Sequence, residues 1–211
     1  MAIILMVSQN SYGRVKSTPV NADSILLQYF RLLDSDNPEA ECNKWASTKS
    51  ETELAIIPIV VGFGLMNQVE GNIMTDSILY EAYLSAIRLI EKGITAIEQS
   101  GINDALYMTT GDAGLVPVRY ILANAYDKVY KYIEADSAYV ETAKEIGRDF
   151  GVESEEFVFW TNKCAESLQR KNKNYEGAIH LLLPAKDAAL YSSEVADSTA
   201  CDYLISLARN Y

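Results

Sequence analysis

His180 is the only histidine in this chain of 211 residues, and histidine is the side chain best suited to general acid–base chemistry near neutral pH. A general base needs a nucleophile or an orienting carboxylate within hydrogen-bonding reach. The sequence around Ile179-His180-Leu181 nominates neither. We therefore expect a packed or surface histidine with no catalytic role.

Two other segments carry residue types that are used in catalysis or phosphate binding. Thr110-Gly111-Asp112-Ala113-Gly114 is rich in glycine, but it lacks the Lys-Ser/Thr pair of a phosphate-binding loop and follows no expected strand. Asp34-Ser35-Asp36 lacks the spacing of the paired carboxylates in helical prenyl-chain enzymes, and helix capping accounts for the acidic run from Glu153 to Glu156. No constellation supports a hydrolase or transferase, so the sequence predicts no catalytic residue and no enzyme.

The three cysteines, Cys42, Cys164 and Cys201, are widely spaced and form no CxxC pair. A single histidine cannot complete a Cys/His zinc site with them. We expect small, buried cysteines, and we expect neither a metal site nor a cofactor.

The composition bounds the class of partner. With 49% hydrophobic residues the chain can bury a sizeable core. The net charge of −11 argues against nucleic acid, because an anionic surface repels phosphates and releases no counterions from them. Proteins or peptides, particularly basic or neutral ones, are the expected partners.

Residues 1–20 leave the cellular location open. The apolar run Ala2–Val7 lacks a basic flank and is short for a signal peptide, yet it resembles the remnant of an export signal. A docked N-terminal segment explains it equally well, so periplasmic and cytoplasmic locations are both retained. No run of 18 uninterrupted apolar residues occurs, and we expect no membrane span.

Helical periodicity organises a first region, residues 21–101. It predicts a helix over Ser24–Leu33, with Asp23 as its cap, and an apolar helix over Glu51–Gln68 that Pro58 must begin or kink. A longer helix runs from Thr75 or Asp76 to Gly101. Its apolar stripe has a period of three or four residues and comprises Leu79, Tyr83, Ile87, Ile90, Ile94 and Ile97.

Residues 117–211 form a second region, after an irregular connection over 102–116. Turn and cap residues divide it into helices, with Ser154 as one cap and Pro184 as an expected kink or early end. The expected helices are Pro117–Val129, Tyr132–Phe150, Ser154–Lys171, Tyr175–Ala189 and Asp197–Tyr211. No segment alternates with a period of two, so the chain is expected to be all-α.

The second region repeats itself. Leu122-Ala123-Asn124-Ala125-Tyr126 recurs as Leu207-Ala208-Arg209-Asn210-Tyr211, which is 85 residues later and therefore two periods of about 42 or 43. Two single positions share this pitch, because Tyr132 precedes Tyr175, and Ala135 precedes Ala178, by 43 residues. Small residues such as alanine let antiparallel helices approach to about 8–10 Å. The spacing indicates stacked helical hairpins.

The same residues carry a resemblance to a known family. Leu122, Ala123, Tyr126, Tyr132, Ala135 and Tyr139 stand where the tetratricopeptide repeat (TPR) family places its large and small packing residues. The pitch is longer than the usual 34 residues and is similar to the family's long-pitch variety, of about 42 residues. Tyr130 replaces the family's turn glycine, and Ala165 and Gln169 replace its Leu and Tyr in the middle unit. The resemblance implies a right-handed α-α superhelix, preceded by an irregular helical N-terminal part.

The resemblance also implies a function, which is to bind a protein or peptide in a concave groove as a scaffold, adaptor or sensor part of a larger protein. First-helix residues of the family line that groove. In this chain they are Tyr120, Asn124, Asp127, Lys128, Trp160, Lys163, Ser167, Arg170 and Arg209. Beside Asn124, the cations Lys163, Arg170 and Arg209 are expected to receive a peptide carboxylate or an acidic side chain.

Two further expectations concern the edge of the stack and the alternative function. A stack that ends in an unpaired first helix leaves an apolar face uncovered. We expect either that the natural protein continues beyond Tyr211 or that self-association or a partner covers this edge; the alternative is that the last helix is a degenerate capping helix. The alternative function is an exported ligand- or glycan-binding protein similar to helical lipoproteins, although no lipobox cysteine follows the N-terminal apolar run.

Overall fold

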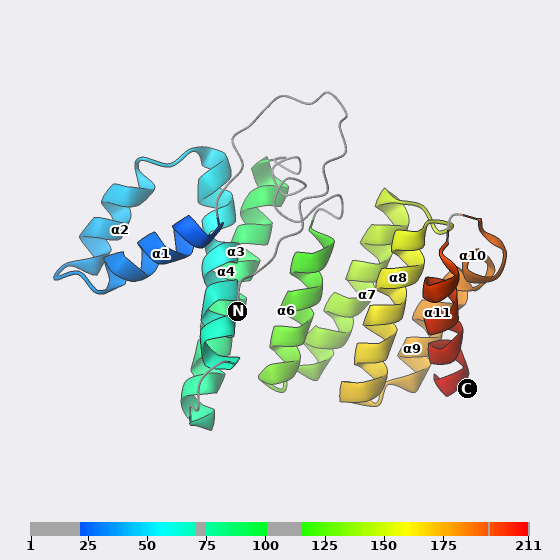
Figure 1. The fold of residues 1–211 in the computed structure, drawn as a ribbon. Helices are drawn as coiled ribbons and strands as arrows, with labels where there is room; N and C mark the ends of the chain where they lie inside the picture. Colours follow the sequence, from blue (N-terminus) through cyan, green and yellow to red (C-terminus); the bar gives the residue numbers. More distant parts are fainter. Residues whose placement is uncertain (1–21, 71–74, 101–114, 194, 211) are drawn as a thin grey trace. The chain divides into compact units, whose positions relative to one another are not determined.

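The computed structural model describes residues 22–70, 75–100, 115–193 and 195–210. Every regular element in these residues is helical, which confirms the all-α prediction for this part of the chain (Figure 1). The chain divides into two compact units, Met1–Val118 and Arg119–Tyr211. The N-terminal segment 1–20 and the glycine-rich loop Thr110–Gly114 lie outside the described residues.

A pair of long helices, α3 and α4, forms the core of the first unit. The α4 stripe predicted from the sequence is buried from Tyr83 to Ile97, while Leu79 near its start is half-buried. The shorter helices α1 and α2 precede this pair. The helices of the first unit are α1 (Ala22–Leu33), α2 (Pro38–Ala46), α3 (Glu51–Glu70) and α4 (Asp76–Ser100).

Two glycines let α3 and α4 approach closely. A Cβ atom built on Gly62 of α3 would lie 2.7 Å from Cγ1 of Ile90, and one on Gly93 of α4 would lie 2.5 Å from Cγ1 of Ile59. Each helix therefore contributes one glycine that receives an isoleucine of the other helix. Gly62 and Gly93 thus serve the close packing of the two helices.

Two details of the first unit differ from expectation. Helix α3 passes through Pro58, so a helix start at that residue is not observed, although the proline cannot donate the backbone hydrogen bond of its turn. Helix α2 is not among the helices expected from the sequence, and it buries no residue fully. The sequence nevertheless indicates where this helix begins. The Asn37 side chain accepts a hydrogen bond from the amide of Ala40, and Pro38 occupies the first turn.

Within the described residues, the segment Glu51–Val69 of α3 has the length and composition of a membrane-spanning helix, with a mean hydropathy of 1.5. Packing inside the protein accounts for much of this apolar character, because 56% of the apolar window is buried in the structure. A helix at the core of a folded unit has the same composition.

The second unit is a row of antiparallel helices (Figure 1). Helix α8 packs against α7, α9 and α11, so it lies at the centre of the unit. As expected, Pro184 interrupts the fourth helix, with a 3-10 turn over Leu183–Ala185. The helices are α6 (Val116–Lys128), α7 (Tyr132–Asp149), α8 (Glu155–Ser167, continued by a π turn over Leu168–Asn172), α9 (Tyr175–Leu182), α10 (Lys186–Tyr191) and α11 (Asp197–Asn210).

Local chemistry sets the ends of these helices. Ser154 Oγ accepts a hydrogen bond from the amide of Phe157 at 3.1 Å and caps α8, as predicted. Asn174 caps α9 in the same way, through the amide of Gly177 at 2.9 Å. Its side-chain nitrogen also donates to Asp136 Oδ2 at 2.8 Å, which ties the start of α9 to α7.

Buried positions in this unit recur with the pitch seen in the sequence. Ala135 of α7 and Ala178 of α9, 43 residues apart, are both fully buried. Tyr139 and Leu182, four residues further along each helix, are also fully buried. Equivalent positions of α7 and α9 therefore face the interior of the unit.

Candidate functional site

Helices α6 and α8 meet through the side chains of three predicted site residues. The ring of Tyr120 on α6 packs edge-on against the ring of Trp160 on α8, with their centroids 5.6 Å apart. The hydroxyl of Tyr120 lies 3.2 Å from Oγ of Ser167, two turns further along α8. Tyr120 and Trp160 stay half-buried, whereas Ser167 is only 6% exposed. The contact leaves two partly accessible aromatic rings at the surface.

Asp127 faces the interior. Its side chain is 8% exposed, and its Oδ2 accepts a hydrogen bond from the hydroxyl of Tyr139 at 2.8 Å. Burial raises the pKa of Tyr139, and the negative charge of Asp127 and the hydrogen bond to it raise it further. Asp127 therefore joins α6 to α7 within the unit and presents little carboxylate surface to a ligand.

The other two predicted residues of α6 lie near its end. Asn124 is half-buried, and its Nδ2 donates to the backbone oxygen of Tyr120 at 2.8 Å, so this hydrogen bond stays within the helix. Lys128 is exposed in the last turn. A cation at this position is favourable for the helix dipole as well as for a ligand.

The outer face of α8 combines aromatic and cationic side chains. Lys163 is half-buried, with its Nζ 5.5 Å from the centroid of the Phe159 ring, and the rings of Phe159 and Trp160 are 5.4 Å apart. Arg170 follows two turns after Lys163; its side chain is 66% exposed and lies 3.7 Å from Oε1 of Glu166. We name the set Tyr120, Phe159, Trp160, Lys163 and Arg170 the α8 face.

Phe159 was not among the predicted site residues. The mapping from the repeat selected positions by their spacing from Ala165, and Phe159 lies one residue outside that set. The structure exposes its ring, whereas its neighbours Phe157 and Val158 are buried. The sequence offers one indication, because Phe159 lies four residues before Lys163 and so shares a helix face with that cation.

Arg209 lies on α11, exposed in the last turn. Among the contacts of the described residues, none joins it to the α8 face. Instead other side chains of α11 tie it to α8 and to α9. Thr199 Oγ1 donates to Glu155 Oε1 at 2.8 Å, and the Tyr203 hydroxyl donates to the backbone oxygen of Leu182.

Groups with catalytic potential lie apart from this face. His180 is exposed on α9, with its Nε2 3.9 Å from Oε1 of Glu176 on the same helix. Cys164 is buried, and burial raises the pKa of its thiol. In the described part of the chain, no three His, Cys, Asp or Glu side chains gather as metal ligands.

Comparison of the chain with protein-family models, with curated proteins and with solved structures finds no match. The function therefore has to be argued from the residues themselves.

Proposed function

We propose that the chain is a protein- or peptide-binding helical-repeat module of the long-pitch TPR kind, acting without catalysis. Its two-helix units, α6 with α7 and α8 with α9, support this proposal, because Ala135 and Ala178 occupy equivalent buried positions in their second helices. Stacked helical hairpins present one face of each first helix to a ligand. In this chain the first helices are α6, α8 and α11.

The α8 face is the proposed binding surface, and the contact between Tyr120 and Trp160 carries this assignment. It brings the side chains of two first helices together and leaves both rings partly accessible. Residues three or four apart on a helix share a face, so the ammonium group of Lys163 belongs on the same side as Trp160. Aromatic residues and arginine are enriched where proteins bind other proteins.

The expected occupant is a peptide segment with an acidic side chain or a free terminal carboxylate. Lys163 on α8 and Arg170, seven residues later in the π turn that continues α8, supply the two cations. The ion pair between Arg170 and Glu166 is long, at 3.7 Å, and the guanidinium side is 66% exposed, so a ligand carboxylate can compete for it. The apolar part of the segment would pack on Phe159 and Trp160.

Selection from a random peptide display library on the purified chain tests this proposal. Parallel selections use Lys163→Glu with Arg170→Glu and, as a matched control, Arg88→Glu with Lys92→Glu, two exposed cations of α4. We expect acidic peptides to be enriched by the wild-type chain and by the control, and to be lost with the α8 variant. Circular dichroism of both variants would verify that they fold.

Two results would overturn the proposal. Equal enrichment by the wild-type chain and the α8 variant would remove the α8 face from recognition. Binding on a glycan array that depends on Trp160, with no peptide enrichment, would favour the exported glycan-binding alternative, because sugar rings also stack on exposed aromatic side chains.

A further inference from the structure

Two hollows adjoin the loop between α7 and α8 in the second unit, and the side chain of Val152 lines both of them. The first has a volume of about 430 Å³, and Gly147 and Phe157 form its apolar part. The second has a volume of about 530 Å³ and extends to Asp187 and Tyr191 on α10. Val152 is 49% exposed, so an accessible apolar side chain is shared by both hollows.

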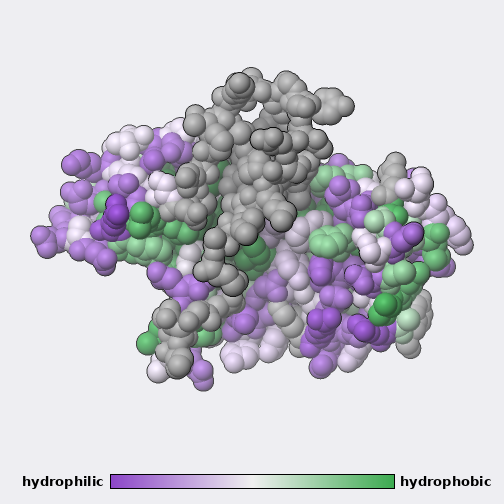
Figure 2. Space-filling model, in the orientation of Figure 1, coloured by the Kyte–Doolittle hydropathy of each residue, from purple (hydrophilic) through white to green (hydrophobic). Residues whose placement is uncertain are grey.

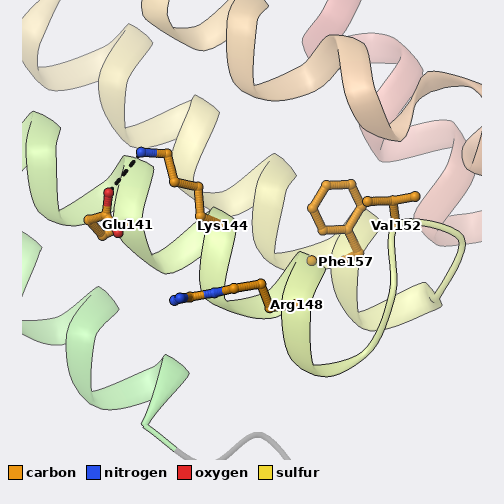
Figure 3. A pocket seen from close by; sticks show the side chains of 6 residues that line it. Glu141, Lys144, Arg148, Val152 and Phe157 are labelled. Carbon is orange, nitrogen blue, oxygen red and sulfur yellow. Dashed lines mark hydrogen bonds and ion pairs between the residues drawn. The ribbon is translucent and has the colours of Figure 1, made fainter.

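The first hollow has a positive wall. Glu141, Lys144 and Arg148 follow one another along α7, and Lys144 Nζ lies 2.8 Å from Glu141 Oε1 (Figure 3). The hydrogen bond from Lys144 lowers the pKa of Glu141, so this carboxylate stays ionised and offsets the charge of the lysine. Arg148 then leaves a net positive charge, while Phe157 and Val152 lie together on the other side of the view.

The second hollow is negative. Its lining carries the carboxylates of Glu153 and Asp187 and, among the described residues that line it, no lysine or arginine. Ser192 Oγ donates to the backbone oxygen of Glu153 at 3.2 Å, which fastens the α7–α8 loop to the end of α10. The two hollows thus carry opposite charges around one shared apolar residue.

We propose that the two hollows together bind one extended peptide segment in which an apolar side chain lies between an acidic residue and a basic residue. The apolar side chain contacts Val152 and Phe157, the acidic residue lies near Arg148, and the basic residue lies near Glu153 and Asp187. A uniformly charged segment would meet like charge in one hollow. The site shares no residue with the α8 face, so a test of one proposal does not decide the other.

Figure 2 shows one face of the molecule, and over the helices of the second unit hydrophilic side chains are interspersed with smaller hydrophobic areas. A mixed surface of this kind suits a short segment with both charged and apolar residues better than a purely apolar partner. The opposite charges of the two hollows and the shared Val152 set the choice of probe, which must offer both charges and an apolar centre.

The test uses fluorescein-labelled heptapeptides and the full chain, with binding followed by fluorescence anisotropy. The probe has two glutamates, a central Leu-Phe-Leu and two lysines, and its controls carry four glutamates or four lysines. We expect the mixed probe to bind tightest. Arg148→Glu should weaken it by roughly tenfold and make the four-lysine peptide the preferred one, because the positive wall has been reversed.

Two more variants keep the proposal falsifiable. Val152→Ser should weaken all three peptides, whereas Ile205→Ser, at a position of similar exposure on α11, should leave them unchanged. The same titrations in the Lys163→Glu, Arg170→Glu chain remove binding of the probes to the α8 face, and the preference for the mixed probe should persist there. Equal affinity of the three peptides for the wild-type chain, or an unchanged preference in Arg148→Glu, would overturn the proposal.

Discussion

Tyr130 and Lys173 adopt the same left-handed backbone conformation, with φ angles of 61° and 57°, at positions 43 residues apart. Tyr130 ends the turn after α6, where the amide of Lys131 donates to the oxygen of Tyr126 and the amide of Tyr130 to that of Asp127. This hydrogen-bond pattern terminates a helix and favours glycine at the left-handed residue. At Lys173 the amide of Asn174 reaches back to Leu168, because a π turn widens the end of the helix.

Replacing either residue by glycine should stabilise the second unit. A side chain in the left-handed region costs about 1–2 kcal/mol, and glycine returns roughly 0.5–1 kcal/mol of that as extra unfolded-state entropy. We expect Tyr130→Gly and Lys173→Gly each to raise the free energy of unfolding by up to about 1 kcal/mol in urea titrations. Ser137→Gly, at an exposed position inside α7, is the control and should lower it. Destabilisation by both turn variants would contradict this interpretation of the turns.

The buried hydrogen bond between Tyr139 and Asp127 should contribute more to the free energy of unfolding than the hydroxyl of an exposed tyrosine does. Tyr139→Phe removes a donor to a buried carboxylate, and we expect a loss of about 1–3 kcal/mol in the free energy of unfolding. Tyr175→Phe, on the exposed start of α9, should change stability by less than about 0.5 kcal/mol. Similar losses in the two variants, measured by thermal or urea unfolding, would show that the buried pair contributes nothing special.

The same tyrosine predicts an alkaline instability. Burial and Asp127 raise the pKa of Tyr139 in the folded chain, whereas an ordinary tyrosine pKa is 10.0. Above that pH the unfolded state releases the proton and the folded state keeps it, so the stability that is fully present at lower pH is lost as pH rises. This group alone should contribute a slope of about 1.4 kcal/mol per pH unit.

Comparison with Tyr139→Phe isolates that contribution from the other ionising groups. Urea unfolding on both sides of the tyrosine pKa should show a shallower decline for the variant than for the wild-type chain. Parallel declines would mean that Tyr139 ionises as readily in the folded state as in the unfolded state.

Periodicity predicted much of the fold, because the relevant residues repeat along single helices. The stripe of α4, the cap at Ser154 and the break at Pro184 all follow from local rules on spacing, capping and backbone hydrogen bonds. Helix α2 was missed because hydrophobic periodicity indicates only helices that bury one face, and α2 buries no residue fully. The cap at Asn37 was the remaining indication.

The site was less predictable than the helices. The repeat mapping placed Tyr120, Trp160 and Ser167 on first helices, and these three do lie together. It could not show that Asp127 would turn inward, because the hydrogen bond from Tyr139 depends on how two helices pack. The hollows around Val152 depend likewise on the path of a loop and on α10, which no periodicity describes.

The paired glycines of the first unit should tolerate no side chain. Gly62→Ala would place a Cβ 3.0 Å from the backbone oxygen of Ala86 as well as against Ile90, so α3 and α4 would have to move apart. We expect Gly62→Ala and Gly93→Ala each to lower the free energy of unfolding by about 1–3 kcal/mol, although alanine is the better helix former. Thr95→Ala, exposed on α4, is the control. Stabilisation by either glycine variant would disprove the close approach.

Trp160 offers the most direct test of the proposed binding face. The chain has two tryptophans, so Trp45→Phe leaves Trp160 as the only tryptophan emitter. Titrating this variant with an acidic peptide from the display selection should change its emission saturably, and the same titration in the Trp45→Phe, Lys163→Glu chain should require a much higher peptide concentration. Binding detected by calorimetry without any change in Trp160 emission, or with the same affinity in both chains, would contradict the account.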